Sequence, residues 1–321
     1  MAAVIETDKL TKIYEGALKG QDVTALKSLD LEVREGEILA YLGPNGSGKT
    51  TTIKLILGLI FPTSGSLKIM GRKDIGANFI KRNIGYLPEG AYYPEFLRGE
   101  EVLRFYGQLY GLAGRDLKRR VGDVLELVGM SRARNRMVRG YSKGMRQRIG
   151  LAQALVSDPK ILILDEPTTG LDPIARKEIR DILVRLRNEG KTLLISSHEL
   201  LEVELISDRV GILYDGELKT LGALSDLLTD RDITVVVAGL TAQARERLES
   251  GGVEVEEAIG EHTTLRVPSN RNVYEVIDLC KAANASMVSV RPRRETLEEL
   301  FVRVVGDAGD QAAEKQKETA K

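Results

Sequence analysis

The segment "GPNGSGKTT", residues 43–51, joins the apolar run "EILAYL" (37–42) to the helical pattern "TTIKLILGLI" (51–60). It fits G-x-x-x-x-G-K-[ST], a pattern in which glycines allow backbone amides to turn inward on phosphate oxygens. The positive end of the following helix dipole adds to the same site. A strand, a glycine-rich loop and a helix in this order predict a nucleoside triphosphate site in an α/β fold.

The positions of this loop have distinct expected roles. The amine of Lys49 is expected to reach the β- and γ-phosphates, and the hydroxyl of Thr50 is expected to bind Mg²⁺. The residues expected to hold the nucleotide here are Gly43, Pro44, Asn45, Gly46, Ser47, Gly48, Lys49, Thr50 and Thr51.

A second apolar run, "ILILDEP" (161–167), carries two acids at its end. In open α/β sheets ligands bind at the carboxyl ends of the strands. Asp165 suits Mg²⁺, directly or through water, and Glu166 is placed to orient or deprotonate an attacking water. Paired acids at a strand end are also common as plain solvated residues. Their position after the phosphate loop, 116 residues beyond Lys49 (165 − 49), favours the catalytic interpretation.

The next apolar run, "TLLISSHE" (192–199), ends in a histidine. Ser196 and Glu199 have the spacing of a capping box for a following helix. His198 is then either a residue at the start of that helix or a polar contact to the γ-phosphate. The helical pattern at 173–190 lies between the two runs, with Asp172 as its N-cap, and this strand–helix–strand order predicts a parallel sheet.

The pattern changes near residues 227–232. Strands and helices then follow in the order βαββαβ, which is typical of a small α+β, ferredoxin-like domain, expected over 229–306. The end, 307–321, has almost no large apolar residue, and its composition predicts disorder.

The composition narrows the class of protein. The 321 residues include 47 basic and 47 acidic side chains, so no bulk charge indicates a nucleic-acid partner. The single cysteine, Cys280, suits a reducing cytoplasm. The start of the sequence does not have the pattern of a secretory signal. No apolar run approaches the length of a membrane span. We expect a soluble protein that reaches a membrane only through a partner.

The segment "YSKGMRQR" (141–148) begins another helical pattern. Ser142 and Gly144 are small residues that leave backbone amides exposed, which makes a second anion site. An ordinary capped helix would explain them equally well when this segment is taken alone.

Taken in order, the phosphate loop, "YSKGM", "ILILDEP", "TGLDP" (169–173) and the histidine after "LLISS" resemble the nucleotide-binding subunit of an ATP-binding cassette (ABC) transporter. The likeness covers residues 4 to about 225 and is strongest to ABC-2-type exporter ATPases. It implies a P-loop ABC ATPase cassette over 1–228, with a parallel core sheet, an antiparallel β subdomain and a helical subdomain at about 90–155.

The resemblance also implies roles for single residues. Tyr14 would stack on adenine, although an ordinary edge-strand tyrosine explains it too. Ser142 and Gly144 would contact the γ-phosphate of ATP bound to the opposite subunit, and Asp172 would cross that interface. His198 would contact the γ-phosphate of its own site. The usual signature L-S-G-G-Q is altered here, with departures at Tyr141, Lys143 and Met145.

The stretch "IGYLPEGAYYPEF" (84–96) matches the loop that joins the Mg²⁺ site to the helical subdomain in this family. The family usually has glutamine where this chain has Glu89. We expect Glu89 to be a metal ligand, engaged only in the closed state. Tyr92, Tyr93 and Phe96 are expected to build a surface that faces the membrane partner, with ordinary packing of the helical subdomain as the alternative.

The implied function is an ATPase motor with ATP and Mg²⁺ as ligands. ATP would close a dimer with a second copy or a homologous subunit, and a separate transmembrane permease at the cytoplasmic face of the membrane would receive the motion. Segments such as "GLDPIA" (170–175) also resemble ATPases that serve nitrous oxide reductase maturation. Export of a drug, lipid or polysaccharide fits at least as well.

Two alternative functions fit the sequence less well. A soluble ABC ATPase acting on DNA or ribosomes usually carries two cassettes, a long coiled coil or zinc-binding cysteines. This chain has one P-loop, one cysteine and no sustained heptads. A P-loop kinase or GTPase leaves "YSKGM" and "TGLDP" unexplained.

Overall fold

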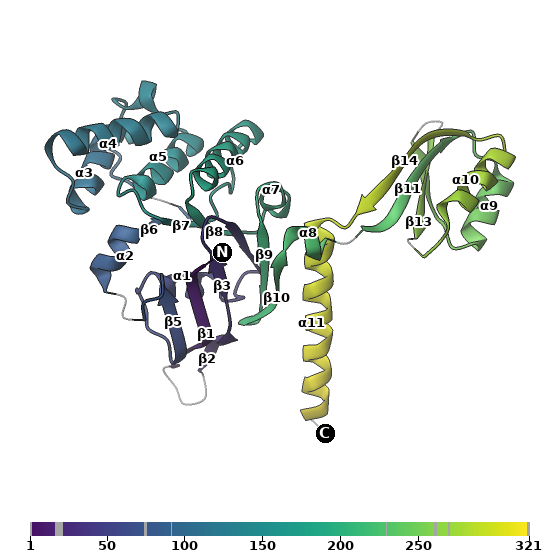
Figure 1. Cartoon of the computed structure of the whole chain (residues 1–321), viewed down its shortest axis with the longest axis horizontal. Helices are drawn as coiled ribbons and strands as arrows, with labels where there is room; N and C mark the ends of the chain where they lie inside the picture. Colours follow the sequence, from purple (N-terminus) through teal and green to yellow (C-terminus); the bar gives the residue numbers. More distant parts are fainter. Residues whose placement is uncertain are drawn as a thin grey trace. The chain divides into compact units, whose positions relative to one another are not determined.

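The computed structural model describes residues 2–16, 22–73, 76–90, 92–228, 230–259, 262–268 and 270–319. Over this part of the chain it divides into two compact units (Figure 1). The first, here called the cassette, runs up to Leu224 and resumes at Phe301. The second is Ser225–Leu300.

The cassette is built on a sheet with the strand order β10-β9-β4-β8-β7-β6. Its strands are β4 (Ile38–Leu42), β6 (Ile84–Leu87), β7 (Ile161–Asp165), β8 (Thr192–Ser197), β9 (Arg209–Tyr214) and β10 (Glu217–Ala223). All pairs are parallel except β9 with β10. Every residue of β4, β7 and β8 is buried, as expected for strands covered on both faces.

A second, antiparallel sheet lies beside it and is centred on β1. It contains β1 (Ala3–Tyr14), β2 (Val23–Leu29), β3 (Glu32–Arg34) and β5 (Ser64–Ile69), and β1 pairs with the other three. Its buried residues, such as Leu10 and Leu29, share one core with Tyr41 of β4 and Ile53 of helix α1 (Lys49–Ile56). The P-loop helix is therefore held between the two sheets.

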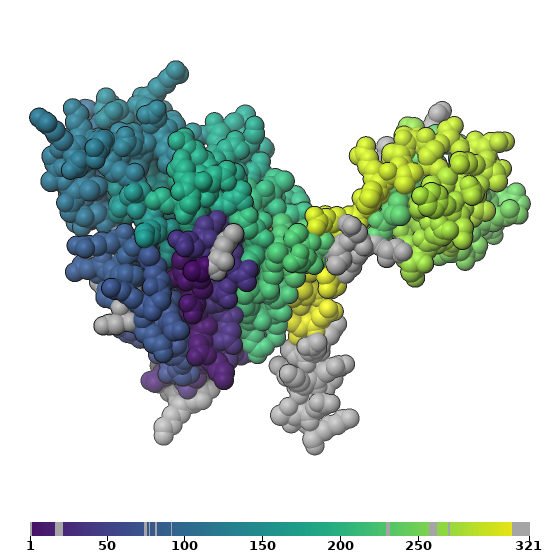
Figure 2. Space-filling model, viewed as in Figure 1, coloured from purple at the N-terminus to yellow at the C-terminus, as the bar shows by residue number. Residues whose placement is uncertain are grey.

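The helices of the cassette fall into two groups. The helical subdomain contains α3 (Gly99–Leu109), α4 (Gly114–Leu127), α5 (Lys143–Leu155) and two 3₁₀ turns at Ser131–Ala133 and Val138–Gly140. Figure 2 shows this part, coloured blue to teal, as a distinct lobe of the cassette surface. The other group is α2 (Ala77–Asn83), α6 (Pro173–Asn188) and α7 (Leu200–Glu204). The short helix α8 (Leu224–Leu227) begins at the last cassette residue before the second unit.

The second unit is an antiparallel sheet with the order β12-β13-β11-β14. Its elements are β11 (Asp230–Ala238), α9 (Ala242–Ser250), β12 (Glu254–Ile259), β13 (His262–Pro268), α10 (Val273–Ala282) and β14 (Ser286–Arg294). Val235, Leu265 and Cys280 are fully buried in its core. The predicted βαββαβ order and the predicted fold class, an α/β cassette with a small α+β domain, are confirmed.

The last helix, α11 (Leu297–Thr319), differs from the sequence-based prediction. It continues through most of 307–321, where composition predicts disorder. Alanine, glutamate, glutamine and lysine dominate that segment, and all four are strong helix formers. The change of unit also falls after Leu224, earlier than the expected boundary at 228, and the chain rejoins the cassette at Phe301. In the described residues, no helix combines the length and the apolar character that a membrane crossing requires.

Candidate nucleotide-binding and catalytic site

The P-loop fills the turn between β4 and α1, and two of its glycines are required by close contacts. A Cβ atom on Gly43 would lie 2.3 Å from the carbonyl oxygen of Leu213. Gly48 has a φ of 109°, and a Cβ there would lie 2.6 Å from the carbonyl oxygen of Ala25. Positive φ values of this kind favour glycine. The loop can take this shape only with glycine at both positions.

The side chain of Lys49 is buried beneath the loop. Its amine donates hydrogen bonds to the carbonyl oxygens of Gly43, at 2.6 Å, and Pro44, at 3.2 Å. Burial lowers the pKa of Lys49, and the nearby carboxylates, Glu166 first, act in the opposite direction. The hydroxyl of Ser47 is also buried and has no hydrogen-bond partner in the described structure. A desolvated amine and an unsatisfied hydroxyl in a glycine-rich loop fit a bound phosphate group.

The acidic pair, Asp165 and Glu166, lies at the end of β7, and the backbone of Glu166 has an unusual conformation. Glu166 has a φ of +51°, in the left-handed region that residues other than glycine seldom adopt. Its amide donates to the carbonyl oxygen of Ser196 at 3.0 Å, and the Ser196 hydroxyl donates to Asp165. Burial raises the pKa of Asp165, and the hydrogen bond from Ser196 opposes that rise. Backbone strain of this kind concentrates at functional sites.

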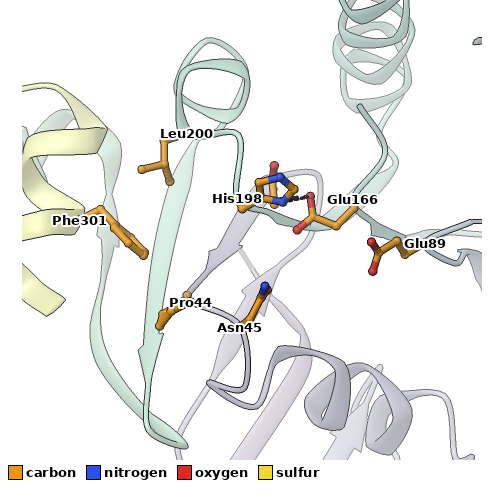
Figure 3. Close-up of a pocket in the computed structure, with 9 residues that line it drawn as sticks. Pro44, Asn45, Glu89, Glu166, His198, Leu200 and Phe301 are labelled. Atoms are coloured by element: carbon orange, nitrogen blue, oxygen red, sulfur yellow. Dashed lines mark hydrogen bonds and ion pairs between the residues drawn. The ribbon is translucent and has the colours of Figure 1, made fainter. Parts of the chain in front are cut away.

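The carboxylate of Glu166 holds His198 on the neighbouring strand end. Nδ1 of His198 lies 2.8 Å from Oε2 of Glu166, and the Thr169 hydroxyl donates to the same oxygen at 2.8 Å. Glu166 is 9% exposed and His198 is 58% exposed. Figure 3 shows the two side chains pointing toward each other. The pair therefore presents one buried acid and one accessible imidazole.

Two hollows are lined by the residues that we predict to bind the nucleotide and the metal ion. The smaller, about 170 Å³, is lined by P-loop residues 45–51 with Glu89, Asp165 and Glu166. The larger, about 310 Å³, contains Gly43, Pro44, Asn45, Glu89, Glu166 and His198 in its lining. The structure thus brings together every predicted residue of the P-loop, the acid pair, Glu89 and the histidine. Leu200 and Phe301 also line the larger hollow, and sequence reasoning missed both.

The smaller hollow offers oxygen donors that suit Mg²⁺. Among the described residues, no three His, Cys, Asp or Glu side chains are grouped to hold a metal ion. Mg²⁺ usually keeps several waters and binds one or two carboxylates together with substrate phosphates. Thr50, Asp165 and Glu89 share the smaller hollow with Lys49, so these residues fit Mg²⁺ that arrives with a nucleotide.

The remaining predicted residues lie outside both hollows. Ser142 caps α5, where its hydroxyl accepts a hydrogen bond from the Met145 amide at 3.2 Å. Asp172 caps α6 as predicted and accepts from the amides of Ile174 and Ala175. The two caps are neighbours, since a Cβ on Gly144 would lie 3.3 Å from the Cβ of Ala175.

Tyr14 lies at the end of β1 and is 39% exposed. The amine of Lys12 lies 5.2 Å from the centre of its ring. The ring is partly accessible to solvent, as stacking on adenine requires. An ordinary edge-strand tyrosine would be equally accessible, so exposure does not distinguish the two interpretations.

The aromatic residues after Glu89 divide into two groups. Tyr92 and Phe96 are 95% and 73% exposed. Tyr93 is buried, its hydroxyl donates to the side-chain oxygen of Gln153, and its ring meets Tyr106 edge to face. The expectation that Tyr93 faces a partner is wrong, because its ring packs inside the helical subdomain.

The predicted capping box is also wrong. Ser196 is the partner of Asp165, and Glu199, the residue before α7, makes no side-chain cap. The amide of Glu199 instead donates to the Ser197 hydroxyl at 3.0 Å. The Ser196 side chain thus bonds to the acidic pair instead of capping the following helix.

Comparison with known proteins places these features in a family. A model of the ABC transporter family matches residues 26–169. The ABC transporter ATP-binding protein sll0415 of Synechocystis sp. is 38% identical over 96% of this chain and 86% of its own length. The bacitracin transport ATP-binding protein BcrA of Bacillus licheniformis is 41% identical over 68% of this chain and 69% of its own. The linearmycin resistance ATP-binding protein LnrL of Bacillus subtilis is 32% identical over 88% and 94%.

Solved structures agree with this result. The ATP-binding cassette MJ0796, in a dimeric post-hydrolysis state bound to ADP and Pi, superimposes with a TM-score of 0.63. It is 26% identical and covers 68% of this chain and 98% of its own. A structure of the ATP-binding subunit of an ABC transporter gives a TM-score of 0.61 at 32% identity, with 70% and 91% coverage.

Proposed function

This chain belongs to the family of ABC transporter ATP-binding proteins and is an ATPase, and we propose that it drives an exporter whose membrane-spanning permease is a separate chain. The observation that best supports this proposal is that the predicted site residues fall into two groups. The P-loop, the acid pair and His198 line the two hollows, whereas Ser142 and Asp172 lie outside them. Such a division is what two chains sharing each nucleotide require. The similarity to BcrA and LnrL supports export.

Within one chain, the proposed chemistry follows from the contacts. Lys49 and the loop amides bind the phosphates by charge-assisted hydrogen bonds. Thr50 and Asp165 would hold Mg²⁺, and the ion would neutralise charge on the phosphate oxygens. Glu166, fixed by Thr169 and His198, accepts the proton of the attacking water or orients it. The accessible imidazole of His198 contacts the γ-phosphate.

Between chains, a second copy or a homologous subunit completes the site. Ser142 and Gly144, at the start of α5, supply amide and hydroxyl donors to the γ-phosphate held by the opposite P-loop. Asp172 lies beside them and crosses the same interface, and Tyr14 stacks on adenine. Hydrolysis removes the charge-assisted contacts, so ATP favours the closed dimer and its loss favours the open one.

The permease surface is proposed to include Tyr92 and Phe96, at the cytoplasmic face of the membrane. In cells of the source organism, the tagged full chain is expected to co-purify with an integral membrane protein from detergent-solubilised membranes. The double variant Tyr92→Ala/Phe96→Ala should recover at least about fivefold less of it, since exposed aromatic anchors carry much of an interface's energy. Its ATPase activity without the membrane protein should be unchanged.

The matched control is Tyr274→Ala, which removes an equally exposed ring, 72%, from the second unit. Its recovery of the membrane protein should equal that of the wild type. Equal losses in both variants would contradict the assignment of this surface. Salt-dependent binding to DNA or ribosomes, without a membrane protein, would favour the alternative of a soluble ABC ATPase.

Glu89 is proposed to touch the metal only in the closed state. A carboxylate binds Mg²⁺ more strongly than an amide does, so Glu89→Gln should need about threefold to tenfold more Mg²⁺ for half-maximal hydrolysis, a cost of about 1 kcal/mol. The measurement is steady-state phosphate release across a Mg²⁺ titration at saturating ATP. Identical titration curves would show that Glu89 is not a ligand. Glu126→Gln, an exposed change on α4, is the control.

A further inference from the structure

One corner of the larger hollow is apolar, and two of its residues, Leu200 and Phe301, have no role in the proposed chemistry. Phe301 of α11, Leu200 of α7 and Pro44 of the P-loop line it. In Figure 3 Phe301 and Leu200 lie toward one end of the hollow and Glu89 toward the other, with His198 and Glu166 between them. The apolar corner therefore adjoins the proposed catalytic pair.

Leu200 connects this corner to His198. It is the first residue of α7 and follows His198 by two positions. The imidazole of His198 is 58% exposed, so packing around the ring does little to hold it. Its position depends on the contact with Glu166 and on where the chain segment 197–200 lies.

That segment is held on one side by ion pairs from α6. Arg176 lies 3.1 Å from Glu199, and Arg180 lies 2.6 Å from Glu202 of α7. Leu200, between these two acids in sequence, shares the hollow with Phe301. The start of α7 thus has charged contacts from α6, and its apolar side chain faces the hollow that Phe301 of α11 also lines.

The helix that carries Phe301 is itself placed by packing in the cassette. Ala308, two turns further along α11, is 8% exposed. A Cβ on Gly309 would lie 3.6 Å from the hydroxyl of Tyr214, at the end of β9. Phe301 and Ala308, seven residues apart, share one face of the helix, and Val302 is 66% exposed. Phe301 therefore lies on the same face of α11 as the buried Ala308 and lines the hollow from the start of that face.

We propose that Phe301 is a positioning residue for ATP hydrolysis, because its ring limits the movement of Leu200 and so keeps the His198 imidazole on Glu166. The inference rests on the roles proposed for Glu166 and His198. It adds a residue from the far end of the chain to a reaction that otherwise uses residues up to 198. Phe301 does not line the smaller hollow, where Lys49, Thr50 and Asp165 lie, so we expect its effect on turnover and not on nucleotide affinity.

The test compares full-length Phe301→Ala with wild type. The turnover number should fall about tenfold, within the roughly 10²-fold that a misplacement of about 1 Å can cost. The KM for ATP and the Kd for a non-hydrolysable ATP analogue should change less than about twofold. Phe301→Leu, which keeps apolar bulk, should restore most of the turnover. Val302→Ala, on the exposed face of the same helix turn, should behave as wild type.

A double-mutant cycle makes the mechanism specific. If Phe301 acts through Leu200, then Leu200→Ala alone should reproduce the loss, and the double variant should lose little more than either single variant. Fully additive losses would overturn the proposal, as would normal turnover in Phe301→Ala or a parallel loss of affinity and turnover. Thermal unfolding of each variant identifies a folding defect, in which case Leu200→Ala and Phe301→Leu decide the question.

Failure of this inference is separable from failure of the proposed function. Glu166→Gln is assayed in parallel. If it abolishes hydrolysis and Phe301→Ala does not change turnover, the proposed chemistry stands and the role of Phe301 is refuted. If Glu166→Gln hydrolyses ATP normally, the proposed chemistry itself is refuted.

Discussion

Replacing Glu166 with glutamine is expected to lower ATP turnover by about 10²-fold or more, since general bases contribute about 10²–10⁴-fold. The amide keeps the size of the side chain and an acceptor for the Thr169 hydroxyl, but it cannot take a proton. ATP binding should persist, because the phosphates are held by Lys49 and the loop amides. Phosphate release at saturating ATP gives the turnover, and equilibrium binding of labelled ATP gives the affinity.

The same variant should accumulate a dimer in the presence of ATP, because the contacts that hydrolysis normally removes now remain. Size-exclusion chromatography with ATP, and without it as control, measures this species. Adding Ser142→Ala should reduce the dimer, since Ser142 contacts the opposite nucleotide in the proposed arrangement. Near-normal turnover in Glu166→Gln would show that another group is the base.

Replacing Lys49 with methionine is expected to remove most of the ATP affinity. Methionine keeps the length and apolar stem of lysine without the charge. Each hydrogen bond to a charged group contributes about 1.5–3 kcal/mol, so Kd for ATP should rise about 10-fold to 150-fold. Isothermal calorimetry with ATP and Mg²⁺ measures the change.

The stability of the nucleotide-free protein should respond to Lys49→Met differently from the ATP affinity. The amine of Lys49 is desolvated beneath the loop, and burial lowers its pKa, so its removal also removes a buried charge. Its loss also leaves the carbonyl oxygens of Gly43 and Pro44 without this donor, so the two effects oppose each other and the thermal midpoint of nucleotide-free Lys49→Met should shift much less than the midpoint measured with ATP. Lys54→Ala, an exposed change on the same helix, should leave ATP affinity unaltered. An affinity equal to wild type in Lys49→Met would contradict the P-loop assignment.

Much of the fold could be predicted because local signals and tertiary structure agree. The runs at β4 and β7 are apolar at almost every position and β8 is apolar at its centre, 193–195, which favours strands buried on both faces. Asp-Gly is a dipeptide that favours a tight hairpin turn, and Asp215 and Gly216, between β9 and β10, both adopt positive φ. The P-loop and acid pair were predictable because fixed chemistry demands fixed residue types at strand ends.

The errors arose where long-range contacts override local patterns. Ser196 has capping-box spacing but bonds to Asp165, a partner 31 residues away. Tyr93 has the same local sequence character as Tyr92, but it is buried against residues that are not adjacent in sequence, among them Gln153 of α5 and Tyr106 of α3. Phe301 lies more than 100 residues beyond His198, so no local pattern connects them.

The path of the chain makes the ferredoxin-like unit an insertion, not an appendage. The backbone leaves the cassette after Leu224 and rejoins it at Phe301. Ending the chain at residue 300 would remove most of α11, including the part that belongs to the cassette. Splicing 224 to 301 would remove the unit together with the first turn of α11, residues 297–300.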